Sequence, residues 1–410
     1  MTRRAMSHNA TDNSGVEQGD YMARSYEILS ADSHLDLSPD QWKHRAPAKW
    51  REQVRVVRLP DGQDAVIVGD AKPARIGLTR SVGVARDQLH LQVPTFENSG
   101  GTGSPEKRLR EQDQDGVEGE IMFSRIQGTL KNINDHEGYL ALVHAYNEYL
   151  AEEYAAVAPD RLIPMGVIPS TGIDDALREL EYCVKAGMRG VLIDRFPSGK
   201  GTPSPEDDRF WEATLQANMP VTHHTNAGIT RMTGKDEQTF PYKKGVREGT
   251  DGLGNDPMRH WFFRFCGDAA CAPLQMAVTG VWDRFPKLRI YWAETMIGWL
   301  EYALWQMDDH YERYKYLAHE VYGMDWLERM PSEYVRTHCL WGFLSDPVGV
   351  QRRGAVGTEN VMWGSDFAHA ASDWPNSRKV IEKDFAGVPA DDRYQLLAGN
   401  AIRYFHLDEP

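Results

Sequence analysis

Acidic and histidine side chains follow several apolar segments of the chain, at the point where each segment ends. A mixed set of carboxylates and imidazoles suits Zn²⁺, Fe²⁺ or Mn²⁺, whereas Ca²⁺ prefers oxygen ligands alone. The sequence therefore predicts a divalent metal centre, provided that the fold brings these segment ends together. The residues concerned are Asp32, His34, His223, His224, Glu294, Asp366 and His369.

Each of these residues taken alone also has a purely structural explanation. Asp32 could cap a turn or a helix, Asp366 could cap the helix that follows it, and Glu294 could pair with an arginine. Neighbouring residues of a strand point to opposite sides, so only one of His223 and His224 is expected to face a common site. The coincidence of such residues at four segment ends favours the metal centre.

Eight apolar segments supply the strands that would position these residues. Several are almost continuously apolar, which is typical of parallel strands buried on both faces, and helical patterns lie between most of them. This alternation predicts an α/β fold, a (β/α)8 TIM barrel in which all strand ends meet at one mouth. An open doubly wound sheet is the competitor, but no GxGxxG follows the first strand. The predicted strands are residues 27–32, 120–124, 162–169, 189–194, 219–224, 288–294, 335–341 and 360–366. The predicted helices are residues 136–158, 173–187, 273–286 and 297–321.

Two connections, after strands 1 and 5, are longer than a simple barrel needs. Residues 38–105 contain VRVVRLPDGQDAVIVGD, which predicts a β-hairpin turning at Asp61 and Gly62, and residues 225–266 are rich in Gly, Thr and charge. Loops that follow barrel strands build the face where active sites lie. We therefore expect both insertions to wall the site, with contacts between subunits as the alternative.

The composition excludes several classes of function. A formal charge of −14 argues against a general binder of nucleic acid or anionic membranes. No apolar run reaches the ~20 residues that span a bilayer, and the polar N-terminus does not resemble a secretory signal. The four cysteines form no CxxC pair, as expected for reduced thiols in a cytoplasmic protein. We expect residues 1–25 to form a flexible tail and residues 26–410 to form one domain.

Six segments, in order along residues 26–408, carry a resemblance to a known family. They are ADSHLDLSPDQW, LREQDQDGVEGEIMFS, PVTHHTNAG, TGVWDRFPKLRIYWAETMIGWLEYAL, NVMWGSDFAHAASDWP and LLAGNAIRYFHL. Their order is more persuasive than any one of them, and WGSDFAH and GNAIRYF are the most specific. On these segments the chain resembles the amidohydrolase superfamily, in its amidohydrolase-related branch of metal-dependent hydrolases and non-oxidative decarboxylases.

The resemblance implies a metal site at the mouth of the barrel. By position, its ligands would be Asp32, His34, His224 and Asp366, with Asp366 also acting as general base or acid and His223 as the alternative to His224. The chain departs from the decarboxylases of this branch at Glu294, where they tend to have a histidine. This departure weakens the transfer of their mechanism, and an extra carboxylate could bind a second ion, so one or two ions are expected.

From these features the sequence predicts a metal-dependent hydrolase that cleaves an ester, thioester or amide bond of a small, hydrophobic organic acid derivative. Candidates for contacts with the reacting groups or the substrate are Arg125, Arg195, His223, His260, His369 and Trp374, although rim ion pairs, capping or core packing explain them equally well. One alternative is non-oxidative decarboxylation of an aromatic or unsaturated carboxylic acid. A second is a barrel that binds a ligand without turnover. The expected partner is a small molecule, and a homodimer is left open.

Overall fold

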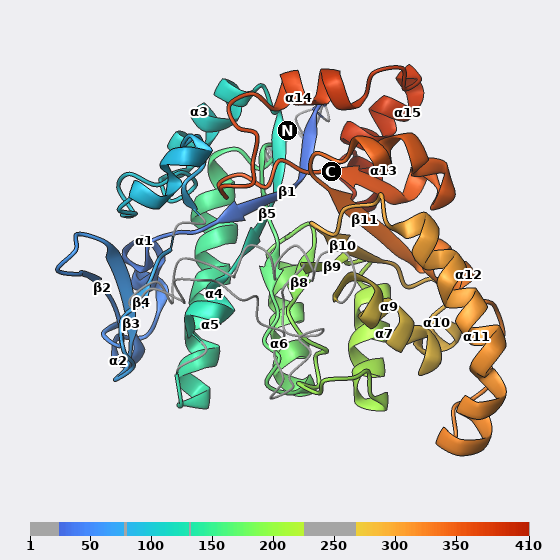
Figure 1. Cartoon of the computed structure of the whole chain (residues 1–410). Coiled ribbons are helices and arrows are strands. Elements are labelled where there is room, and N and C mark those ends of the chain that lie inside the picture. Colours follow the sequence, from blue (N-terminus) through green and yellow to red (C-terminus); the bar gives the residue numbers. More distant parts are fainter. Residues whose placement is uncertain (1–23, 78–79, 131–132, 225–267, 410) are drawn as a thin grey trace, which may run out of the picture.

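Eight strand positions, all parallel, form the centre of the molecule in a computed structural model that describes residues 24–77, 80–130, 133–224 and 268–409. One sheet has the order β1-β5-β6, and a second has the order β7-β8-β9-β10-β11-β12 (Figure 1). All eight predicted strands are therefore present. They are β1 (Leu29–Leu35), β5 (Gly119–Ser124), β6 (Leu162–Pro164) with β7 (Gly166–Val167), β8 (Val191–Ile193), β9 (Val221–His224), β10 (Ile290–Ala293), β11 (Cys339–Phe343) and β12 (Val361–Trp363).

Backbone hydrogen bonds join the two sheets on both sides. Strands β6 and β7 are two halves of one predicted strand, and Met165 between them donates to the Met122 carbonyl of β5 at 3.0 Å. On the other side, the Asp366 N–H donates to the Asp32 carbonyl at 2.9 Å, and Ser33 forms a parallel bridge with Phe367. Hydrogen-bonded neighbours thus run through all eight positions and return to β1, as the predicted TIM barrel requires.

The predicted strand 335–341 is wrong in its first half. Residues Pro331–His338 form helix α12, and only Cys339 and the residues after it are extended. Proline is favoured at the first helical position, and the Glu333 carboxylate accepts a hydrogen bond from the Met330 N–H at 2.8 Å. These N-terminal helix signals outweigh the β-branched residues on which the strand prediction rested.

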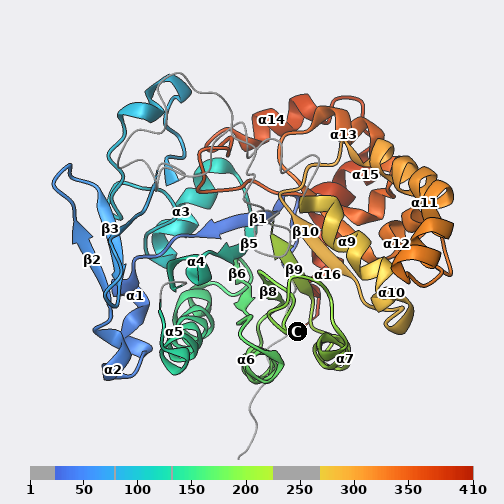
Figure 2. The same ribbon diagram turned by 60° about the horizontal axis from the view of Figure 1, so that its bottom comes forward.

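Helices surround the strands and follow the predicted ranges closely (Figure 2). Helix α6 shows why: it has acids in its first turn and Lys185 in its last, and it buries Ala176, Leu180 and Cys183 at helical spacing. The predicted helix 273–286 is interrupted at Gly280, which has a φ of 69°. The outer helices include α5 (His136–Tyr149), α6 (Ile173–Lys185), α7 (Asp208–Gln216), α9 (Asp268–Val278), α10 (Val281–Arg284) and α11 (Leu300–Tyr322).

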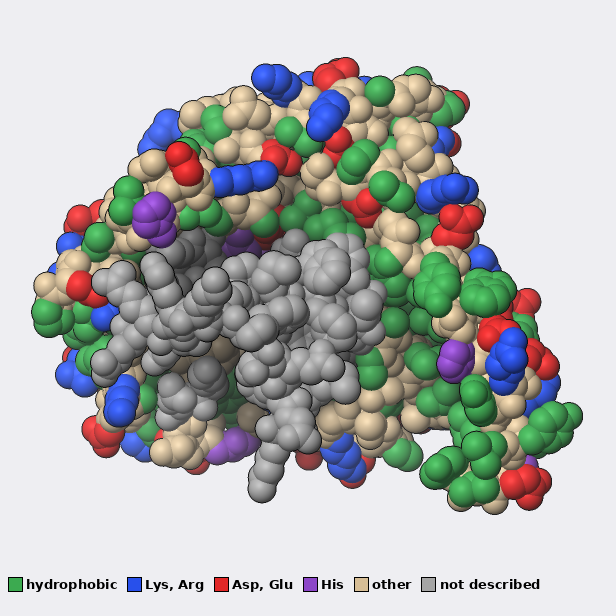
Figure 3. All heavy atoms as spheres, in the orientation of Figure 1, with side chains coloured by type: hydrophobic (Ala, Val, Ile, Leu, Met, Phe, Trp, Pro, Cys, Tyr) green, Lys and Arg blue, Asp and Glu red, His purple; other side chains and the backbone are tan. Residues whose placement is uncertain are grey.

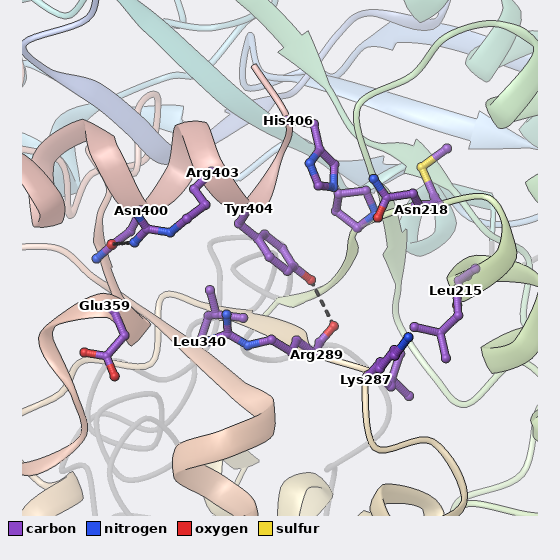
Figure 4. A pocket seen from close by; sticks show the side chains of 14 residues that line it. Leu215, Asn218, Lys287, Arg289, Leu340, Glu359, Asn400, Arg403, Tyr404 and His406 are labelled. Carbon is purple, nitrogen blue, oxygen red and sulfur yellow. Dashed lines mark hydrogen bonds between the residues drawn. The ribbon is translucent and has the colours of Figure 1, made fainter. Parts of the chain in front are cut away.

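A small inner core fills the barrel and is continued by the C-terminal segment. Leu29 and Ile121 belong to this core together with Phe405, which follows helix α16 (Asn400–Tyr404). The Tyr404 hydroxyl donates to the Val221 carbonyl, at the beginning of β9, at 2.7 Å. A cavity of about 230 Å³ at this end is lined by residues that precede or begin the strands, such as Arg289 (Figure 4). It therefore lies opposite the strand ends that carry the predicted metal ligands.

The insertion 38–105 contains the predicted hairpin. Strand β2 (Val54–Arg58) pairs antiparallel with β3 (Asp64–Val68), and β4 (Ala74–Arg75) extends the small sheet.

The insertion 225–266 lies outside the described residues, as does almost all of the predicted tail 1–25. Within the described ranges, no helix combines the length and the apolar character needed to cross a membrane. The domain limits and the cytoplasmic location stay predictions.

Candidate metal centre

Strand β1 buries Asp32 and His34 completely at the mouth of the barrel. Their exposed fractions are 0% and 1%, and the His34 Nε2 atom lies 3.6 Å from Asp32 Oδ1. Ser33 between them donates its hydroxyl hydrogen to the Ile121 carbonyl at 3.0 Å. Gly364 packs so closely on Asp32 that a Cβ atom in its place would lie 3.0 Å from the Asp32 backbone nitrogen. The carboxylate position is therefore fixed by the backbone of the opposite segment.

Strands β9 and β10 bring His224 and Glu294 to the same place. The His224 Nε2 atom lies 3.5 Å from Asp32 Oδ1 and 3.6 Å from Glu294 Oε2. His223 does not join this cluster, because its ring packs 4.9 Å from the Trp292 ring. Burial, with a contribution from His224, lowers the pKa of His223 to about 3. Of the two adjacent histidines, His224 is thus the one that meets the carboxylates.

The segment after β12 supplies Asp366 and His369. The Asp366 Oδ1 atom lies 3.1 Å from His34 Nε2 and 2.9 Å from His369 Nδ1. The imidazole rings of His34 and His369 stack with their centroids 3.7 Å apart. Four strand ends that are far apart in the sequence therefore converge, as the barrel prediction required.

Two of these acids stand on backbone that is unfavourable for their residue type. Glu294 has a φ of 57° and Asp366 a φ of 52°. A residue other than glycine in this left-handed region costs on the order of 1–3 kcal/mol, and such residues cluster at functional sites. Glu294 comes directly after β10 and Asp366 three residues after the end of β12, where the barrel mouth begins.

The polar atoms of the cluster fit a bound cation. Both carboxylate oxygens of Asp32 and the Nδ1 atom of His34 are buried, yet within the described part of the chain none has a hydrogen-bond partner. Leaving such atoms unsatisfied is costly. Donor atoms 3.1–3.6 Å apart also match ligands that share one ion at bond lengths of about 2.1 Å.

The charge distribution separates the roles of the two stacked histidines. Burial, reinforced by His369, lowers the pKa of His34 to about 4, and a neutral imidazole is the form that binds metals. Burial opposes the charged form of His369 as well, but Asp366 and Asp36 raise its pKa to about 9. Burial by itself would raise the pKa of Asp366, but His369 and His34 hold it well below the usual value.

Asp36 and Arg80 extend the row of charged groups formed by Asp366 and His369, and sequence reasoning missed both. Arg80 Nη2 donates to Asp36 Oδ1 at 2.8 Å, and Asp36 Oδ2 lies 3.6 Å from His369 Nε2. Burial opposes ionisation of Asp36, but Arg80 and His369 hold its pKa well below the usual range. Asp36 continues the alternation of Asp32 and His34, which was its only signal. Arg80 belongs to the insertion 38–105, so at this point the insertion does wall the site.

Arg108 supports the cluster from behind. Its guanidinium is buried, donates to Glu120 at 2.6 Å and to the His34 carbonyl at 3.0 Å, and lies over the Phe367 ring at 4.4 Å. It therefore holds both the strand of His34 and the segment after Asp366. The available signal was its place directly before the segment LREQDQDGVEGEIMFS.

The predicted substrate contacts are less closely tied to the cluster. Arg125 directly after β5 and Arg195 two residues after the end of β8 are exposed, and no described contact joins either to the acids of the cluster. Trp374 is half-buried, and its indole N–H donates to the Glu111 carbonyl at 2.9 Å. His260 lies outside the described residues. Sequence reasoning missed Phe123, whose ring centroid is 5.5 Å from that of His224 and gives the mouth an aromatic wall.

Comparisons with known proteins agree with this architecture. A family model described as amidohydrolase matches residues 101–407. A decarboxylase of Emericella nidulans is 28% identical over 148 residues, which make up 36% of this chain and 42% of that protein. The gamma-resorcylate decarboxylase of a Polaromonas species is 22% identical over 318 residues, or 74% of this chain and 87% of that protein. The chain thus spans less than half of the first relative and most of the second.

A solved structure shares the fold. The 5-carboxyvanillate decarboxylase of Novosphingobium aromaticivorans, in complex with manganese and 4-hydroxy-3-methoxy-5-nitrobenzoic acid, gives a TM-score of 0.62 at 15% identity. The similarity covers 93% of this chain and 96% of that chain. At this identity the likeness carries the fold alone.

The hydrolase predicted from the sequence is wrong in the light of these relatives, which are named for decarboxylation. That prediction rested on Glu294 standing where a histidine was expected. Glu294 is buried and lies 3.6 Å from His224 Nε2, and a carboxylate in such a position suits either reaction. The residue therefore never favoured hydrolysis over decarboxylation.

Proposed function

The chain belongs to the amidohydrolase family, and on that premise we propose that it is a metal-dependent decarboxylase of an aromatic hydroxy acid. The observation that carries the proposal is a pair of close ligand groups that share the buried His34: Asp32 and His224 lie on one side of it, and Asp366 and His369 lie on the other. The two relatives that act as decarboxylases support the choice of reaction.

We assign the binding of a divalent ion to Asp32, His34, His224 and Asp366, with Glu294 at the border of the site. When bound, the ion supplies positive charge that attracts an anionic substrate and stabilises negative charge formed in the reaction. Manganese is the first candidate because a structure with the same fold contains it, and Zn²⁺ and Fe²⁺ suit the same nitrogen and oxygen donors.

The reaction requires one proton for each CO₂ released. As the bond between the ring carbon and the carboxyl carbon breaks, its electron pair stays on the ring carbon, which must then take up a proton. We assign delivery of this proton to Asp366, whose carboxylate is ionised at rest and first takes the proton from His369. His369 Nδ1 lies 2.9 Å from Asp366 Oδ1, and Asp36 lies beside the other nitrogen of His369.

The surroundings of the cluster suit an aromatic acid. The Phe123 ring lies beside both His224 and His34, with centroids 5.5 and 6.5 Å away, and offers an apolar surface to a substrate ring. Burial of Asp32 and His34 keeps bulk water from the reacting groups, which strengthens electrostatic interactions there. Arg125 and Arg195, exposed beyond two strand ends, remain our candidates for binding the substrate carboxylate.

A direct assay tests the reaction. The protein is loaded with Mn²⁺ and incubated with a panel of hydroxy- and methoxybenzoic acids, and released CO₂ and the decarboxylated product are measured. We expect turnover of at least one acid and none by an Asp32→Asn variant. An ester, thioester and amide panel is run in parallel. A metal-loaded protein that releases no CO₂ from any acid contradicts the proposal, and if it also cleaves none of the other substrates, a ligand-binding barrel is favoured.

A further inference from the structure

Helix α11 and the segment that follows it expose many large apolar side chains. Of the fifteen large hydrophobic side chains that are exposed in the described part of the chain, eight fall between residues 302 and 326. Hydrophobic side chains are seen gathered where Figure 1 shows α11 (Figure 3). We call these eight residues the α11 surface. They are Tyr302, Trp305, Tyr314, Tyr316, Leu317, Val321, Tyr322 and Trp326.

The exposure is greatest where the helix leaves the barrel. Its first turns are anchored by Leu300 and Leu304, which are buried one helical turn apart. In its last turns Tyr314 and Tyr316 are both exposed, although they point about 200° apart around the helix axis. Exposed apolar side chains that gather in one region typically mark a surface that contacts a partner. No element among the described residues covers these side chains.

A hollow lies beside the projecting side chains. A cavity of about 490 Å³ opens between α11 and the segment leading to α12, lined by Tyr311, Tyr316, Trp326 and Arg329 among others. The Trp326 ring packs 5.3 Å from the Tyr316 ring and stacks on His319 at 4.5 Å. The same surface therefore carries aromatic projections and a hollow whose lining combines aromatic side chains with charged ones such as Lys315 and Arg329.

We propose that the α11 surface is a two-fold interface between two copies of this chain. In a two-fold pair the same surface is present on both partners, so the projections of each copy can enter the hollow of the other. The area also suits this occupant. Eight large side chains that are about half exposed offer on the order of 800 Å², the amount that each partner contributes to a standard interface. The inference is independent of the reaction proposed above.

Salt gives the interface a distinctive signature. The chain carries a formal charge of −14, so two copies repel each other, while the eight side chains of the α11 surface carry no charge. Raising NaCl from about 0.05 to about 0.5 M screens the repulsion and leaves the apolar burial intact. We therefore expect the dissociation constant of the dimer to fall as salt is added, which is the opposite of an interface held by ion pairs.

Sedimentation and light scattering of the full chain test the interface with matched variants. Val321 on the α11 surface is 62% exposed, and Val348 on helix α13 (Pro347–Arg352) is 63% exposed. Leu317 and Leu91 form a second pair, at 51% and 60%. We compare the double variant L317E/V321E with L91E/V348E, so that the chemical change and the exposure are alike and only the location differs.

The wild type and L91E/V348E are expected to have twice the chain mass of 46.5 kDa at micromolar concentration. L317E/V321E is expected to be a monomer, with a dissociation constant raised at least 100-fold, as for charge placed in an apolar contact. Circular dichroism and metal content confirm that the variant is folded, and Tyr322→Glu provides a second test at the most exposed residue. A monomeric wild type, or equal weakening by both double variants, overturns the proposal.

Discussion

His34 Nε2 lies 3.1 Å from Asp366 Oδ1, which joins the first strand of the barrel to the segment after the last strand. The backbone makes the same connection, because the Asp366 N–H donates to the Asp32 carbonyl at 2.9 Å. The ligand positions of the proposed centre are thus fixed by the hydrogen bonds that link the barrel's first and last strands, and little rearrangement is needed for a cation to bind.

Asp32→Asn should remove the metal and leave the fold intact. The amide keeps the shape of the side chain but loses the negative charge that faces both His34 and His224. We expect metal affinity, measured by titration with Mn²⁺ and by elemental analysis, to fall more than about 100-fold, beyond the effect typical of supporting residues. Asp40→Asn, the same change at an exposed site, should bind metal like the wild type. Equal affinity in the two variants would exclude Asp32 as a ligand.

The centre should hold one ion per chain. Two groups of three potential ligands are present, Asp32 with His34 and His224, and His34 with Asp366 and His369. Both contain His34, and the donor distances place its Nε2 atom near Asp32 and Asp366 alike, which favours a single shared ion. Elemental analysis should give one ion in the wild type and one in Glu294→Gln. Two ions in the wild type that fall to one in the variant would instead identify a dinuclear centre.

The sequence predicted the cluster from a two-residue period and from the topology of parallel strands. Asp32 and His34 share one side of β1 because alternate residues of a strand do so, and His224 and Asp366 join them because strand ends of a barrel meet. Neither rule predicts the position of Arg80, because this residue lies in an irregular insertion and contacts Asp36 only through the tertiary fold.

The type of reaction could not be predicted from the ligand pattern. Glu294 was given weight because its residue type departed from the expected one, but a carboxylate beside His224 has no preference between water and a carboxylic acid as reactant. The strand limit at Cys339 failed for a different reason. Val335 and Thr337 are typical of strands, and the helix that contains them is determined by Pro331 and Glu333 at its start.

Gly364→Ala should damage the metal site through the backbone. The added Cβ would meet the Asp32 Cβ and lie 3.0 Å from the Asp32 nitrogen, and main-chain atoms cannot rotate away. We expect a loss of about 1–3 kcal/mol in the free energy of unfolding, together with weaker metal binding. The control is Gly354→Ala, which has nothing within 4 Å of its new Cβ. Unfolding in urea measures the first effect and Mn²⁺ titration the second. If Gly364→Ala changed neither the stability nor the metal affinity, the close contact between residue 364 and Asp32 would be contradicted.

The stability should depend on pH through His144, which links α5 to α6. The Glu179 carboxylate, 3.1 Å from His144 Nδ1, raises the pKa of this histidine above its ordinary value near 6.5. A raised folded-state pKa contributes stability below the unfolded pKa, and this contribution is lost as the pH rises through the folded value. His144→Gln should therefore reduce the free energy of unfolding more at pH about 5.5 than at pH about 9. An equal loss at both pH values would show that the pair contributes nothing.

Asp366→Asn and His369→Gln should separate metal binding from proton delivery. An amide at position 366 cannot deliver a carboxyl proton, and we expect kcat to fall about 10²–10⁴-fold, together with weaker metal binding. His369 lies outside the four proposed ligands but 2.9 Å from Asp366, so His369→Gln should keep its metal and still lose kcat. In D₂O the wild-type product should carry deuterium at the carbon that held the carboxyl group, observed by NMR. If His369→Gln retains wild-type kcat with a full complement of metal, the proton reaches Asp366 without His369, and the proposed path fails.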